Sequence, residues 1–125
     1  MEQSTARSCD WSRVPKTWGY YQVFYENSNQ VKVKELVCEP HSRLSMQRHF
    51  RRSEFWMFIE GQGYVNTLNS QGQLEKSGPY RAFDHVFIAT EQWHQLENQD
   101  STPVKIVEIQ YGDLCVEEDI ERHTC

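Results

Sequence analysis

Apolar and polar side chains alternate along most of the chain, and many of the apolar ones are aromatic or β-branched. This period-two pattern is typical of β-strands that place one face on a core. Short segments rich in Gly, Asn and Ser separate the alternating runs and predict turns. The pattern therefore predicts an all-β sandwich or barrel of eight strands: Tyr20–Tyr25, Val31–Cys38, Arg43–His49, Glu54–Glu60, Gly63–Leu68, Tyr80–Ala89, Trp93–Asn98 and Val104–Tyr111.

The two ends of the chain differ from this pattern. Asp113 is a residue type that caps helix N-termini, and Glu117 and Glu118 fall early in the segment that follows it. The sequence therefore predicts a short C-terminal helix over Leu114–Arg122. Residues 1–15 are expected to form an N-terminal arm, and residues 16–125 a single domain.

One predicted strand is apolar on both faces. Alternation over residues 54–60 places Trp56 and Phe58 on one side, and Phe55, Met57 and Ile59 on the other. A second sheet or a second subunit must cover such a strand, so we expect a homodimer.

Composition limits the class of protein. The 125 residues fit one domain, and 38% hydrophobic residues with 13% aromatic residues supply a packed core. A net charge of −5 gives no general basic field, so nucleic acid is not an expected partner. No apolar run exceeds the five residues Phe55–Ile59, whereas a membrane-spanning helix needs roughly 20. No membrane partner is expected.

Cellular location is predicted from the N-terminal sequence and the cysteines. Residues 1–13 lack the apolar stretch of a secretory signal, which favours a cytoplasmic protein. Cys9, Cys38, Cys115 and Cys125 show no C-x-x-C spacing, so we expect free thiols.

Four residues could converge into a metal site. Gln47 and His49 share one face of a predicted strand, together with Arg43, and a tight turn through residues 50–53 would bring Glu54 alongside His49. His94 begins a later strand and would join them if it faces inward. Imidazoles and a carboxylate suit zinc, iron, nickel or manganese. The alternative is an exposed polar strand face and a surface histidine, because short motifs recur by chance.

Two segments around these residues resemble the two sequence motifs of the cupin family. Residues 40–61, PHSRLSMQRHFRRSEFWMFIEG, resemble the first motif, with Gln47 where most cupins have a histidine, followed by His49, Glu54 and Gly61 in register. Residues 84–98, DHVFIATEQWHQLEN, resemble the second, with His94 and Asn98 in place.

The closer resemblance is to the type II mannose-6-phosphate isomerase cupin, a domain often fused to mannose-1-phosphate guanylyltransferase. It includes Lys16–Tyr21, Leu44–Trp56, Glu108–Asp113 and Asp119–Arg122, and so covers nearly the whole chain. It implies a double-stranded β-helix, or jelly-roll, barrel in a stand-alone cupin domain. It also implies a divalent metal, most often zinc, on Gln47, His49, Glu54 and His94.

The same resemblance implies an enzyme that interconverts mannose 6-phosphate and fructose 6-phosphate, with a phosphorylated sugar as its ligand. Two alternatives remain open: a non-catalytic, metal-containing sugar-binding or regulatory cupin, and another metal-dependent cupin enzyme such as an oxygenase. The chain also departs from the family pattern. The family's histidine cluster after the first ligand reads Phe50-Arg51 here, which removes at least one imidazole, and His41 and Glu91 stand at glycine positions.

Substrate-binding and catalytic residues are predicted by chemical type. Arg and Lys are natural phosphate partners, and the candidates are Arg43, Arg51, Arg52, Lys34 and Arg122. For each of them a solvated surface residue is the alternative. Isomerisation also needs a base, for which the candidates are Glu108, Glu60 and Lys34. Trp18, Trp56 and Trp93 are interpreted as packing residues, and His85 and His123 as surface residues.

Overall fold

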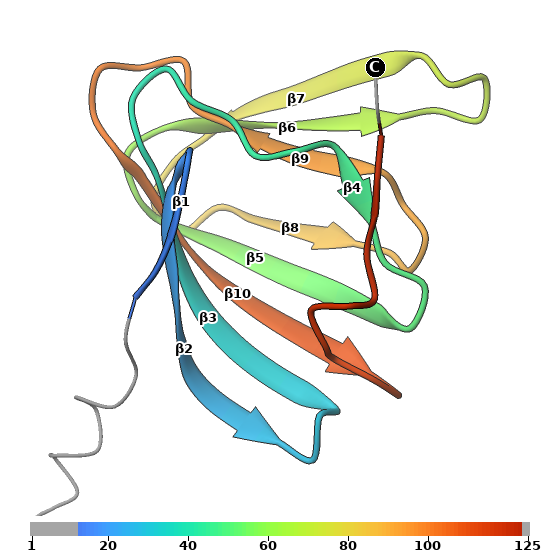
Figure 1. Ribbon diagram of the computed structural model, residues 1–125. Coiled ribbons are helices and arrows are strands. Elements are labelled where there is room, and N and C mark those ends of the chain that lie inside the picture. The colour runs from blue at the N-terminus through green and yellow to red at the C-terminus, as the bar shows by residue number, and fades with distance from the viewer. Residues whose placement is uncertain (1–12, 124–125) are drawn as a thin grey trace, which may run out of the picture.

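Two antiparallel sheets face each other in the computed structural model, which describes residues 13–123 (Figure 1). The six-stranded sheet has the order β1 (Val14–Lys16), β2 (Gly19–Asn27), β3 (Val31–Cys38), β10 (Val104–Gly112), β5 (Arg52–Glu60) and β8 (His85–Ile88). The five-stranded sheet has the order β11 (Glu121–Arg122), β4 (Gln47–Arg48), β9 (His94–Glu97), β6 (Gly63–Leu68) and β7 (Leu74–Tyr80). The predicted all-β barrel is confirmed.

Most predicted strands lie where the alternation placed them, and the exceptions are irregular or exposed. The predicted strand over residues 43–49 is reduced to β4 and an isolated bridge between Arg43 and Glu97. β7 was not predicted, because this edge strand is exposed along nearly its whole length and shows no alternation. Edge strands have one free side, so their sequences are less constrained by burial.

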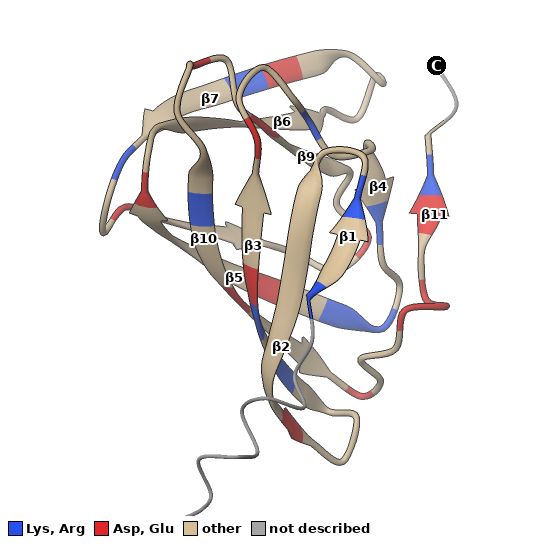
Figure 2. Cartoon of the chain, turned by 60° about the vertical axis from the view of Figure 1, so that its left-hand side comes forward, with Lys and Arg blue, Asp and Glu red and all other residues tan. Residues whose placement is uncertain are grey.

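The predicted C-terminal helix is wrong: no helix occurs among residues 13–123, and Leu114–Arg122 is extended apart from a turn. We call residues 113–123 the C-terminal strap. Figure 2 shows this acidic segment running from the end of β10 to β11, beside β4. Glu117 reaches β3 through Lys34, whereas Asp119 binds backbone amides after β4. These contacts to different parts of the barrel hold the strap in a non-helical path.

The core fills one end of the space between the sheets. Trp56 and Phe58 of β5 pack there with Leu96 of β9 and Ile106 of β10, all buried. Burial of each such side chain contributes about 1.5–3 kcal/mol. The turn after β5 requires Gly61, because its φ is +78° and a Cβ there would lie 2.3 Å from the Pro103 carbonyl oxygen.

The outer face of the six-stranded sheet carries an apolar row across five strands. Its members are directly paired in register: Tyr25, Val33, Ile109, Phe55 and Phe87. Phe55 and Ile109 are half-buried, whereas Phe87 is exposed. The second sheet therefore covers only the inner face of β5.

Two further predictions concern the cysteines and a membrane-spanning helix. Cys38 and Cys115 are buried free thiols, as expected, whereas Cys9 and Cys125 lie outside the described range. Within residues 13–123, no helix has the length and apolar character needed to cross a bilayer.

Candidate metal centre

A cavity of about 1230 Å³ lies between the two sheets and adjoins the apolar core, since Trp56 belongs to both. Its inner wall is polar. Lys34 of β3, Glu54 of β5, His94 of β9 and Glu108 of β10 are all buried and line it. Each follows the strand alternation, so its side chain points inward like the core residues further along the same strand. The fold therefore gathers charged groups inside the barrel.

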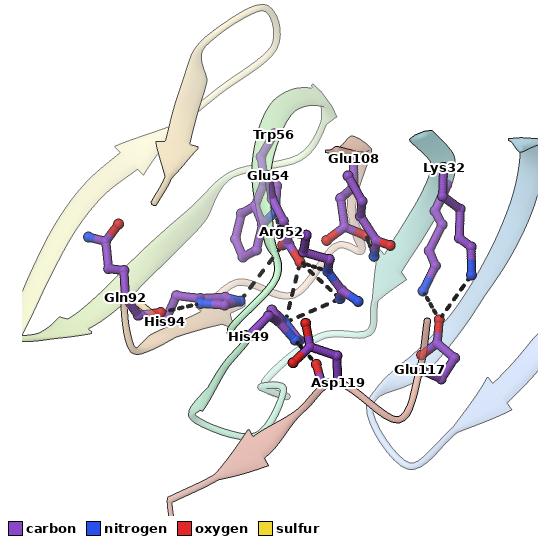
Figure 3. Close-up of polar contacts among 12 residues, drawn as sticks. Lys32, His49, Arg52, Glu54, Trp56, Gln92, His94, Glu108, Glu117 and Asp119 are labelled. Carbon is purple, nitrogen blue, oxygen red and sulfur yellow. Dashed lines mark hydrogen bonds and ion pairs between the residues drawn. The ribbon is translucent and has the colours of Figure 1, made fainter. Parts of the chain in front are cut away.

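His49, Glu54 and His94 form the centre of this wall (Figure 3). All three are buried, and one ligand atom from each lies within 4.8 Å of the others. Glu54 Oε2 is 3.3 Å from His49 Nε2, and Glu54 Oε1 is 3.7 Å from His94 Nε2. The convergence that the sequence predicted for these three residues is present.

Backbone carbonyls orient both imidazoles. His49 Nδ1 lies 2.7 Å from the Asp119 carbonyl oxygen, and His94 Nδ1 lies 2.8 Å from that of Gln92. A carbonyl oxygen only accepts hydrogen bonds, so each Nδ1 carries the hydrogen and each Nε2 lone pair faces Glu54. Burial lowers the pKa of each histidine to about 4, and for His49 the nearby Arg52 charge adds to this effect. Both rings are therefore neutral near pH 7.

The Glu54 carboxylate is held from two sides. Trp56 Nε1 donates to Oε1 at 2.9 Å, and Arg52 Nε donates to Oε2 at 3.0 Å. Trp56 is a packing residue, as expected, but its indole also orients the carboxylate. Arg52, a predicted phosphate ligand, instead forms a buried ion pair with Glu54.

The route by which Glu54 reaches His49 differs from the predicted hairpin. β4 pairs with β9 and β11, whereas β5 pairs with β10 and β8, so β4 and β5 belong to opposite sheets. The turn between them passes from one sheet to the other, with Phe50 and Arg51 exposed. His49 and Glu54 therefore meet across the barrel interior. Gln47 lines the same cavity from β4, directly paired with His94.

The donor set fits a divalent metal ion. Two neutral imidazoles that each carry a lone pair on Nε2, together with one carboxylate, are ligands that zinc, manganese, iron and nickel accept. Carbonyl acceptors on Nδ1 are the usual partners of metal-binding histidines. His49, Glu54 and His94 could thus hold a metal.

A second polar group adjoins the triad. Glu108 is fully buried, and burial together with the negative charge of Glu54 raises its pKa to about 8. Gln110 Nε2 donates to Glu108 Oε1 at 3.2 Å. The Oε1 of Gln110 is buried and has no hydrogen-bond partner among the described residues. An orphaned buried acceptor in a cavity wall suits a ligand that brings a hydroxyl donor.

Lys34 is held beside this group as a cation. Its Nζ lies 2.7 Å from Glu117 Oε2 and 4.1 Å from the centre of the Tyr21 ring. Burial lowers its pKa, but the charges of Glu108 and Glu117 outweigh burial and raise it overall. Lys34 therefore keeps its proton.

The remaining predicted site residues divide into two groups. Arg43 and Arg122 line the cavity. Arg51 is exposed and pairs with Asp113, and Glu60 is exposed at the end of β5, 3.9 Å from Lys105. Neither Arg51 nor Glu60 is among the cavity-lining residues.

Sequence reasoning missed three contributors to the site. Gln110 shares the inward face of β10 with Ile106 and Glu108. A polar residue on a buried strand face is a signal that could have identified it as a site residue. Asp119 and Glu117 had no such signal, because the strap that carries them has no strand periodicity.

Solved structures with the same architecture define the class of fold. CapF, a capsular polysaccharide assembling protein from Staphylococcus aureus, superposes with a TM-score of 0.80 at 15% identity, over 98% of this chain and 35% of CapF. An oxalate decarboxylase structure from Bacillus subtilis, described for its Mn(II) centres, gives a TM-score of 0.77 at 18% identity, over 93% of this chain and 31% of that one. With the inward metal-capable triad, the architecture is a jelly-roll barrel of the cupin class.

The sequence profile described as "Mannose-6-phosphate isomerase C-terminal" matches residues 3–124, so the chain belongs to that family. AlgA, the alginate biosynthesis protein of Pseudomonas aeruginosa, is 29% identical over 109 residues, which are 87% of this chain and 21% of AlgA. Mannose-1-phosphate guanylyltransferase RfbM of Salmonella typhimurium is 31% identical over the same shares of the two chains. The chain thus spans about a fifth of the length of these relatives.

Proposed function

We propose that this cupin is a metal-dependent sugar-phosphate isomerase that interconverts mannose 6-phosphate and fructose 6-phosphate. The observation that carries the proposal is the buried pair of Glu108 and Lys34 beside the triad, in a cavity large enough for a sugar phosphate. Membership in the mannose-6-phosphate isomerase C-terminal family supports the choice of substrate.

Metal binding is assigned to Gln47, His49, Glu54 and His94. When bound, a divalent ion would supply a Lewis acid for the carbonyl or hydroxyl oxygens of the sugar. Zinc and manganese are the first metals to test, zinc because the ligand types suit it and manganese because the oxalate decarboxylase neighbour has Mn(II) centres.

Phosphate binding is assigned to Arg43 and Arg122. Both line the cavity, and neither forms an ion pair within the described part of the chain, so their charges are available to a ligand. Lys34 and Arg52 also line the cavity, but each is already paired with a carboxylate. Guanidinium groups match phosphate oxygens with two parallel hydrogen bonds.

Proton transfer is assigned to Glu108. The reaction breaks the C2–H bond of the aldose and forms a C1–H bond, while a hydroxyl proton moves from O2 to O1. Of the three candidate bases, Glu60 lies outside the cavity, and the pKa of Lys34 is raised still further above neutral. Glu108 remains, because its pKa of about 8 lets the carboxyl both release and accept a proton near neutral pH. Lys34 would stabilise the negative charge that develops on the enediol oxygens. Gln110 Oε1 would accept a hydrogen bond from a sugar hydroxyl.

The test is conversion of mannose 6-phosphate to fructose 6-phosphate by the zinc- or manganese-loaded protein. Glu108→Gln should lower kcat by about 10²–10⁴-fold, the usual contribution of a general acid or base, with metal content unchanged. Glu60→Gln is the matched control and should keep full activity. In heavy water, deuterium should enter at C1 of the ketose or C2 of the aldose.

Two results would reject the proposal. Saturable sugar-phosphate binding without turnover by the metal-loaded protein would favour a sugar-binding or regulatory module instead. Equal activity of Glu108→Gln and wild-type protein would remove Glu108 from the reaction.

A further inference from the structure

The guanidinium of Arg52 contacts two side chains of the candidate metal centre, Glu54 and His49 (Figure 3). Its Nη2 is 3.0 Å from Glu54 Oε2 and 3.2 Å from His49 Nε2, and its side chain is 5% exposed. A carbonyl on the C-terminal strap, that of Val116, accepts a further hydrogen bond from Nη1 at 3.2 Å. A buried cation of this chain is therefore bound to two of the three atoms that a metal would need.

The hydrogen-bond directions mean that the Arg52 guanidinium and a metal ion cannot both bind His49 Nε2. Because Nδ1 of His49 donates to Asp119, Nε2 has only a lone pair, and this lone pair accepts from Arg52. The same lone pair cannot accept that hydrogen bond and bind a metal at once. Charge repulsion between a guanidinium and a divalent ion in a buried site adds to the competition.

We propose that Arg52 is an internal competitor for the metal, and that metal binding releases its guanidinium into the cavity to bind an anion. The proposal rests on the metal site of the proposed function, but not on isomerase turnover. A buried cation that loses its carboxylate partner is strongly destabilised, so an incoming anion is favoured at that moment. By linkage, the anion must raise the affinity for the metal by the same factor by which the metal raises the affinity for the anion.

The affinity test compares wild-type protein with Arg52→Gln, after both have been stripped of metal. Zn²⁺ and Mn²⁺ are titrated calorimetrically, and Trp56 fluorescence gives a second readout because its indole is bonded to Glu54. Arg52→Gln should bind metal about tenfold or more tightly, the size of a typical coupling between two sites. Arg51→Gln is the matched control, because this neighbouring arginine is exposed and paired with Asp113, and it should bind like wild type.

The coupling test uses inorganic sulfate as the anion, at constant ionic strength. Sulfate should tighten metal binding to the wild type and to Arg51→Gln, but leave Arg52→Gln unchanged. If Arg52→Gln does not fold, Arg52→Lys replaces it in the test. Sulfate should then raise the metal affinity of the wild type more than that of Arg52→Lys. Lysine keeps the charge but cannot contact Glu54 and His49 with a planar fork.

Weaker or unchanged metal binding by a folded Arg52→Gln would overturn the proposal, since Arg52 would then only support the site. A wild-type affinity that does not respond to sulfate would also overturn it. Failure of isomerase turnover alone would leave the affinity comparison intact, so the two proposals fail separately.

Discussion

Five non-glycine residues in the described part of the chain have a positive φ, a conformation that side chains rarely accept, and two of them, His41 and Glu91, stand where the family resemblance has glycine. His41 has φ of 57° and Glu91 has φ of 68°. The cost of this left-handed region for a residue with a Cβ is about 1–2 kcal/mol. The Glu91 turn also adjoins the metal centre, because the Glu91 amide donates to the His49 carbonyl at 2.7 Å. The barrel therefore imposes the turn on a residue that does not favour it.

We expect Glu91→Gly to stabilise the protein. Glycine relieves the positive φ but costs about 0.5–1 kcal/mol in chain entropy, so the net gain should be about 0.5–1 kcal/mol. Urea unfolding measures it. Glu91→Ala is the control, because it removes the side chain but keeps the Cβ. An equal gain in Glu91→Ala would assign the effect to the side chain and contradict the backbone explanation.

At the scale of the element, the C-terminal strap is the part that completes the site. The Asp119 carboxylate accepts from the Phe50 amide at 3.0 Å and from the Arg51 amide at 2.9 Å, and so caps the turn between β4 and β5. Its carbonyl orients His49, and β11 pairs with β4. The strap thus ties the sheet that carries His49 to the turn that leads to Glu54.

Asp119→Ala should lower the free energy of unfolding by about 1–3 kcal/mol, because two backbone amides lose their acceptor. Denaturant unfolding measures this change. Asp113→Ala, on the same strap, removes only an exposed ion pair with Arg51 and should cost less than about 1 kcal/mol. Similar losses in the two variants would show that the cap on the turn contributes nothing specific.

Strand alternation predicted those elements that bury one face, and failed where burial does not shape the sequence. Burial alternates strictly along most of β5 and β10, because one side of each strand faces the barrel interior. β7 is exposed, and the strap is stabilised by single polar contacts to distant residues, so neither has a periodic signal. The local features of Asp113 and the acidic residues after it predicted a helix that long-range contacts override.

The residues of the candidate site could be predicted from the sequence, but the strand pairing and the side-chain contacts around them could not. Spacing and family resemblance identified His49, Glu54 and His94, because the parity of positions along a strand indicates which side chains share a face. The same reasoning could not assign β4 and β5 to opposite sheets, since pairing partners depend on the whole barrel. It also could not pair Arg52 with Glu54, a contact set by the rotamers of two long side chains inside the cavity.

At the scale of the whole molecule, we propose that the outer apolar row is the surface on which a second copy of the chain packs. The row is continuous across five strands from Tyr25 to Phe87, and its residues are direct neighbours in register. A two-fold dimer places the same patch on both subunits, so one self-complementary apolar row is sufficient to form the interface. The Glu35–Lys105 ion pair beside the row, at 3.8 Å, gives it a polar margin.

We therefore expect a homodimer of about twice 14.9 kDa in sedimentation equilibrium at micromolar concentration. Phe87→Ser should shift the protein toward the monomer, because it removes a large apolar group from the row. Leu74→Ser is the matched control: Leu74 is 58% exposed and Phe87 53%, but Leu74 lies on β7 in the other sheet, so this variant should remain dimeric. A wild-type protein that sediments only as a 14.9 kDa species would rule out the dimer. Dissociation of both variants alike would place the interface elsewhere.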